Sequence, residues 1–222
     1  MIRMFNLKII LLITTCMIYS SCNQNKSNNN RPELKFKKKE TTGKKILLVQ
    51  PFEDFPISST QIVTNQLKDI YSGTVIIKKP IRLPRFARNT YNTRYRADSL
   101  IHFLKKVSKE GQLIIGLTNH DISHTQRSND GHVLDDDHGI MGLGYCPGRS
   151  CIASTFRLKG KNKYEKLFKV AIHELGHTQG LPHCPVKTCL MRDAEGKDHL
   201  DELKDFCKKC KLFLVQSGWD LN

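Results

Sequence analysis

Residues 173–183 read His173-Glu174-Leu175-Gly176-His177-Thr178-Gln179-Gly180-Leu181-Pro182-His183, an uninterrupted H-E-x-x-H-x-x-G-x-x-H pattern. Residues four apart lie on the same face of a helix, so His173 and His177 can direct two imidazoles at one metal ion. Gly180 tolerates backbone angles that other residues avoid, and Pro182 cannot continue a helix, so the chain can return His183 as a third ligand. Three protein ligands leave one position of a zinc tetrahedron open, which is typical of a catalytic site.

The pattern follows a predicted helix. Residues 163–172 carry apolar side chains at helical spacing and contain neither Gly nor Pro. Glu174 follows the first histidine and is placed to contact a metal-bound water rather than the metal. Because H-E-x-x-H alone also arises by chance on amphipathic helices, Gly180 and His183 carry the prediction of a metzincin-type zinc site.

A second group of metal-ligand residues follows directly. It comprises Cys184, Cys189 and the C-x-x-C pair Cys207 and Cys210. Four thiolates in two close pairs suit a closed, structural zinc site. The alternative is a pair of disulfides, Cys184–Cys189 and Cys207–Cys210, which an exported protein would permit. The spacing favours zinc.

The stretch from His173 to Cys210 resembles the archaemetzincins, whose extended motif joins the three-histidine helix, an adjoining cysteine, C-x-M and a later C-x-x-C. Only the segment between Met191 and Cys207 is slightly shorter than usual for the family. The resemblance implies a zinc-dependent peptidase with a methionine turn at Met191 beneath the catalytic zinc. It further implies hydrolysis of peptide bonds by a zinc-bound water with Glu174 as general base. Endopeptidase and aminopeptidase action both stay open.

Apolar runs and helical patterns alternate upstream of the motif. They predict a layered α/β fold with a partly parallel sheet. The resemblance implies a metzincin-like single domain with a mixed twisted sheet, the active-site helix and a small C-terminal subdomain. The expected strands are 46–49, 75–77, 113–117, 139–146 and 151–158, and the expected helices are 58–71, 96–109 and 198–216. One of the last two strands should bind extended peptide, as the family resemblance implies. Residues 80–95 and 118–138 are expected as loops, the second near the cleft.

The N-terminus is typical of a targeting segment. Arg3 and Lys8 precede an apolar run over 9–19, and Ser20-Ser21 precede Cys22. We therefore expect a lipoprotein signal peptide over 1–21, lipidation at Cys22, a flexible tether over 22–43 and the catalytic domain over 44–222. Cys16 is a competing lipidation site, and an ordinary secretory signal is the alternative. The expected location is the periplasmic or cell-surface face of a bacterial membrane.

The remaining cysteines and the charge bear on partners. Cys146 and Cys151 flank Pro147-Gly148 and are predicted to form a disulfide in an exported chain. The formal net charge is +15, and loss of 1–21 removes Arg3 and Lys8 to leave +13. Because the basic residues are dispersed, we expect no nucleic-acid partner; an anionic cell surface or acidic substrates fit better.

Three functions are compatible with these residues. The first is a monomeric zinc peptidase that acts on peptides or proteins and is held to a membrane through its lipid anchor. The second is a non-catalytic zinc-binding surface lipoprotein. The third is a self-inhibited enzyme in which Cys184 approaches the catalytic zinc. Glu174 favours the peptidase, because a general base has no structural duty in a pure metal binder.

Overall fold

The computed structural model describes residues 45–194 and 197–222. The expected signal peptide, the tether and the lipidation site Cys22 therefore lie outside the described residues. Among the described residues, no helix is long and apolar enough to span a bilayer.

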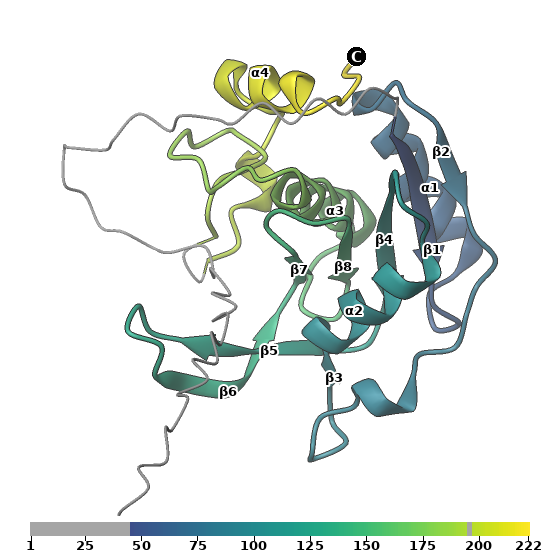
Figure 1. Cartoon of the computed structure of the whole chain (residues 1–222), viewed down its shortest axis with the longest axis vertical. Helices are drawn as coiled ribbons and strands as arrows, with labels where there is room; N and C mark the ends of the chain where they lie inside the picture. The colour runs from purple at the N-terminus through teal and green to yellow at the C-terminus, as the bar shows by residue number, and fades with distance from the viewer. Residues whose placement is uncertain (1–44, 195–196) are drawn as a thin grey trace, which may run out of the picture.

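A five-stranded mixed sheet forms the centre of the fold, in the order β2-β1-β4-β8-β7 (Figure 1). Four strands run parallel and β7 pairs antiparallel with β8. The strands are β1 (Ile46–Pro51), β2 (Val75–Ile77), β4 (Gln112–Thr118), β7 (Gly142–Gly144) and β8 (Ser150–Ser154). This confirms the predicted α/β fold, and it makes β7, rather than β8, the edge strand.

Helices cover both faces of the sheet, since alternate residues of each strand point to opposite sides. On one face Leu47, Ile115 and Ala153 pack with α1 (Ile57–Ile70) and α3 (Lys163–Thr178). On the other face Leu48, Ile114 and Ile152 pack with α2 (Ala97–Val107). Burial on both faces explains why β1 and β4 are almost continuously apolar.

A second sheet replaces the loop expected over 118–138. It has the order β3-β5-β6, with β3 (Tyr95–Arg96) parallel to β5 (Ile122–Arg127) and β5 antiparallel to β6 (Val133–Ile140). The hairpin of β5 and β6 projects from the main sheet (Figure 1). The prediction of a loop was wrong because β6 is largely exposed and polar, and so lacks an apolar stripe. The preceding segment, 80–95, also contains a short helical turn, η1 (Arg85–Ala87).

The C-terminal part contains two short helices instead of the single helix expected over 198–216. These are η2 (Leu200–Glu202) and α4 (Lys208–Gln216). Cys207 precedes α4 as its N-cap, and Cys210 lies in the first turn of α4. The segment packs on the α3 side of the sheet through Leu203, Phe206 and Trp219. It thereby brings the later cysteine pair towards the residues that follow α3.

Candidate active site and cysteine centre

The end of α3 turns the chain back towards its own histidines. Gln179 is the C-cap, Gly180 has φ +94° and the Leu181 amide donates to the Gly176 carbonyl at 3.2 Å. The Gly180 amide donates to His177 O at 2.8 Å, which completes a Schellman cap. As a result the Leu181 carbonyl lies 2.7 Å from Nδ1 of His177. A local glycine cap therefore orients a side chain that lies one turn earlier.

Each of the three histidines has an acceptor at Nδ1. His173 bonds the Leu190 carbonyl at 2.7 Å, His177 bonds Leu181, and His183 Nδ1 lies 3.2 Å from Asp193 Oδ2. A donor hydrogen at Nδ1 leaves the Nε2 lone pair for a metal. The Nε2 atoms of His173 and His177 are 3.0 Å apart, and ligand atoms of all three rings lie within 4.8 Å of one another. Two nitrogens on one zinc lie roughly 3.3 Å apart, so the donor set fits zinc.

His173 is held neutral, as a histidine that binds a metal must be. Burial, together with the neighbouring imidazoles of His177 and His183, lowers the pKa of His173 to about 3. Protons therefore do not compete for this ring at neutral pH.

Glu174 lies beneath the edge strand of the sheet. Its side chain is buried, with 8% exposed, and it packs against Gly142 of β7. A Cβ on Gly142 would lie 2.8 Å from both Cγ and Oε1 of Glu174, closer than non-bonded atoms approach. Only glycine therefore lets β7 approach the carboxylate this closely, which places the strand edge next to the predicted base.

Met191 packs under the same turn of α3. Its side chain is fully buried, and a Cβ on Gly176 would lie 2.4 Å from its sulfur. Its backbone carbonyl accepts the Cys184 amide at 2.7 Å. Met191 thus lies below the histidine helix and also fixes the segment that carries the first cysteine.

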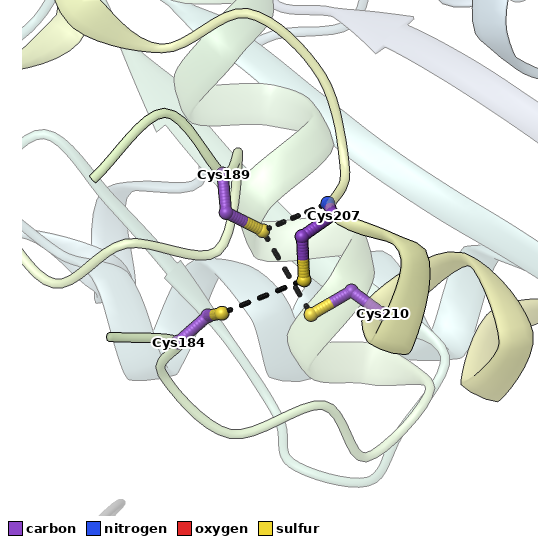
Figure 2. A group of neighbouring side chains, drawn as sticks. All are labelled: Cys184, Cys189, Cys207 and Cys210. Atoms are coloured by element: carbon purple, nitrogen blue, oxygen red, sulfur yellow. Dashed lines mark hydrogen bonds between the residues drawn. The ribbon is translucent and has the colours of Figure 1, made fainter. Parts of the chain in front are cut away.

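The four cysteines converge from the segment after α3 and from the start of α4 (Figure 2). The Sγ atoms of Cys184 and Cys207 are 3.7 Å apart, and those of Cys189 and Cys210 are 3.8 Å apart. Four sulfurs held about 2.3 Å from one zinc lie about 3.8 Å from each other, whereas a disulfide requires about 2.05 Å. All four thiols are free. The close pairs, Cys184 with Cys207 and Cys189 with Cys210, are also not the pairs of the alternative disulfides, Cys184–Cys189 and Cys207–Cys210. The distances therefore fit zinc.

The four thiols differ in acidity when no metal is bound. The pKa of Cys189 falls to about 5 because its sulfur shares a hydrogen bond with the Cys210 sulfur and accepts one from the Cys207 amide. The same bond to Cys189, together with burial, raises the pKa of Cys210, and burial raises that of Cys184 to about 11. Thiols alone thus resist joint ionisation, whereas a divalent ion would compensate four thiolates. Since Cys184 belongs to this group, it is not placed with the histidines as a self-inhibited site would require.

The predicted disulfide between Cys146 and Cys151 is wrong. Neither residue forms a disulfide. Cys151 is fully buried in β8 with its sulfur 3.8 Å from the Ile114 carbonyl, while Cys146 Sγ lies 4.0 Å from Leu181 O. The two side chains therefore contact different elements, which proximity in sequence does not reveal.

Comparison with known proteins agrees with this geometry. The family model described as Peptidase family M54 matches residues 48–216. The chain belongs to peptidase family M54. An archaemetzincin of Methanopyrus kandleri is 30% identical over 152 residues, covering 66% of this chain and 81% of the relative. An archaemetzincin of Halobacterium salinarum is 25% identical over 176 residues, covering 73% of this chain and 95% of the relative.

Solved archaemetzincin structures share the fold. The crystal structure from Methanopyrus kandleri has a TM-score of 0.63 at 27% identity and covers 80% of this chain and 97% of that chain. The structure from Archaeoglobus fulgidus, complexed with malonate, has a TM-score of 0.62 at 22% identity and covers 76% and 99%. As an archaemetzincin, this chain is a zinc metalloprotease. Its two ligand groups, one of histidines and one of cysteines, can bind two zinc ions.

Two residues of this archaemetzincin site escape sequence reasoning. Asp193 meets His183 through a short irregular turn, and Gly142 meets Glu174 across the packing of β7 on α3. For the contact between Asp193 and His183, the sequence offers one signal: Asp193 lies two residues beyond Met191. Gly142 carries no such signal, because its importance lies in what a side chain would displace.

Proposed function

We propose that this archaemetzincin hydrolyses peptide bonds with Glu174 as general base, and that His173, His177 and His183 hold the zinc ion. The observation that carries the proposal is the set of Nδ1 contacts, which directs three imidazoles at one point next to the buried side chain of Glu174. When bound, zinc supplies Lewis acidity, which acidifies water and polarises a carbonyl group.

Glu174 supplies the proton transfers. A carboxylate is ionised at neutral pH, yet it can hold a proton briefly, so Glu174 can take the proton of the attacking water. It then delivers this proton to the leaving amine. The packing of Gly142 against its side chain keeps the carboxylate from swinging towards the sheet.

The edge strand β7 is proposed to bind the substrate. In the main sheet β7 pairs with β8 alone, so its other edge offers backbone groups to an extended peptide. Because Gly142 contacts Glu174, a peptide paired with β7 would run directly past the base.

The cysteine group is proposed to hold a structural zinc. Cys184 and Cys189 follow the histidine helix, whereas Cys207 and Cys210 belong to the C-terminal part. A metal shared by these residues would fasten that part below α3, next to the turn that carries Met191.

The decisive test is Glu174→Gln, with Glu165→Gln on the exposed first turn of the same helix as the matched control. We expect both variants to retain two zinc ions per chain. Cleavage of a broad peptide library should fall by about two to four orders of magnitude in Glu174→Gln and stay unchanged in Glu165→Gln. Unchanged turnover in Glu174→Gln would exclude Glu174 as the base, and a wild-type protein that binds zinc without cleaving any peptide would favour the non-catalytic binder.

We also propose that the chain is exported and anchored through a lipid on Cys22. The charged start, the apolar run and Ser20-Ser21 before Cys22 support this proposal. Cells grown with a clickable fatty acid should label the wild type and Cys16→Ser, but not Cys22→Ser. Loss of label in Cys16→Ser alone would assign the lipid to Cys16 instead of Cys22. An unlabelled wild type would refute the lipid anchor.

A further inference from the structure

A cavity of about 730 Å³ lies beyond the carboxyl ends of β1 and β4. Its lining includes Glu53 and Asp54 after β1 and His120 after β4. Segment 82–88 closes it with three arginines, Arg82, Arg85 and Arg88. None of these residues belongs to either of the two candidate metal groups.

The topology of the sheet creates this opening. The chain leaves β1 through α1 to reach β2 on one side, and it reaches β4 on the other side of β1 through α2. The segments after β1 and β4 therefore diverge. In open α/β sheets such a switch point forms a crevice outside the carboxyl ends of the strands, and ligands bind there. Glu174, on the helix that carries His173 and His177, packs instead against β7, an edge strand of the same sheet.

The charge that faces the cavity is mainly positive. Asp54 Oδ2 is engaged by the protein, because it accepts hydrogen bonds from the Thr118 hydroxyl at 2.7 Å and the His120 amide at 3.1 Å. Glu53 pairs with Arg82 at 3.4 Å, but the two side chains are 56% and 80% exposed, so this pair is weak. Arg85 makes no side-chain hydrogen bond or ion pair within the part of the chain that the structure describes. Its guanidinium is therefore available to a ligand.

Arg88 is held in place before any ligand arrives. Its Nε donates to Tyr95 Oη at 3.1 Å, and its guanidinium lies 5.0 Å from the centroid of the Tyr95 ring. Its Nη1 also donates to Asn92 Oδ1 at 2.9 Å. Asn92 itself lines the cavity with φ +59°, a conformation that few residues other than glycine adopt. A guanidinium fixed in this way loses little conformational entropy on binding.

We propose that this cavity is a binding site for a phosphomonoester, separate from the peptidase site. Guanidinium groups recognise phosphate through paired hydrogen bonds, and a phosphate carries up to two charges on three oxygens. Arg88 is held in place, Arg85 is unengaged, and Arg82 can leave its weak pair with Glu53. Together these three guanidinium groups suit a phosphate ligand better than a ligand with a single carboxylate. The volume accommodates an organic substituent beyond the phosphate.

Calorimetric titration of the purified full chain with phenyl phosphate tests the site, with phenol as the neutral counterpart. We expect saturable binding of phenyl phosphate only. Arg85→Ala should weaken it about tenfold, the equivalent of losing one charge-assisted contact, without disturbing the fold, because this side chain has no partner to lose. The matched control Lys159→Ala removes an exposed positive charge elsewhere and should change nothing.

Two further arms complete the design. His173→Ala should retain wild-type affinity, since a loss there would mean that phosphate binds at the histidines, contrary to the proposal. A phosphoserine peptide, titrated into Glu174→Gln beside its unphosphorylated form, distinguishes a phosphorylated protein from a free small molecule as the source of the group. The proposal is overturned if neither phosphate probe saturates in the millimolar range, or if Arg85→Ala binds as tightly as the wild type.

Discussion

Replacing Gly142 with Ala probes the contact between the edge strand and the predicted base. The new Cβ would lie 2.8 Å from Cγ and Oε1 of Glu174 and 2.8 Å from Cγ1 of Val170. Non-bonded carbons rest at about 3.5 Å or more, so strand and carboxylate must separate by about 0.7 Å. Misplacement on the order of 1 Å can cost about 100-fold in rate. We expect kcat/KM to fall by roughly that factor, with a loss of about 1–3 kcal/mol in stability from overpacking.

The metal should survive this change. His173 and His177 are anchored to the Leu190 and Leu181 carbonyls, not to β7. Zinc content measured by mass spectrometry should therefore match the wild type while peptide cleavage falls. This separates a displaced base from a damaged metal site.

Gly160→Ala is the matched control. Gly160 has φ +93° and no atoms within 4 Å of an added Cβ, so alanine costs roughly 1–2 kcal/mol in strain without contacting Glu174. It should lower the thermal midpoint yet leave kcat/KM near the wild-type value. Wild-type activity in Gly142→Ala, or an equal loss in both variants, would show that the packing of β7 does not position Glu174.

Two other perturbations address the metal groups. Asp193→Ala removes the carboxylate 3.2 Å from Nδ1 of His183 and should weaken zinc binding about 10- to 100-fold in a chelator competition. Activity should return when zinc is added. Asp193→Asn should retain more affinity, because its amide oxygen still accepts the hydrogen bond. The double variant Cys207→Ser, Cys210→Ser should reduce zinc from two ions to one per chain and lower the thermal midpoint, because half of a tetrahedral donor set is lost. Cys146→Ser, outside this set, is the control. Unchanged zinc content in the double variant would argue against a cysteine-bound ion.

Elements with local signals could be predicted from the amino-acid sequence alone. The continuous apolar runs of β1 and β4 reflect burial on both faces, and the spacing of His173 and His177 follows from one helical turn. Gly180 predicted the end of α3, because the positive φ that ends the helix favours glycine. Ligand types and spacings were enough to indicate the family, since metal chemistry restricts which residues can occur.

Contacts between segments that are distant in sequence became visible only in the folded chain. The β5–β6 hairpin carries no apolar alternation, so its pairing became visible only in the fold. Spacing suggested that Cys146 and Cys151 meet, yet Cys146 follows β7 with its sulfur near Leu181, whereas Cys151 lies in β8 with its sulfur near Ile114. The contact of Gly142 with Glu174 and the cavity lined by Arg85 arise from how the strands are ordered. Such contacts depend on the packing of whole elements, and no local periodicity encodes them.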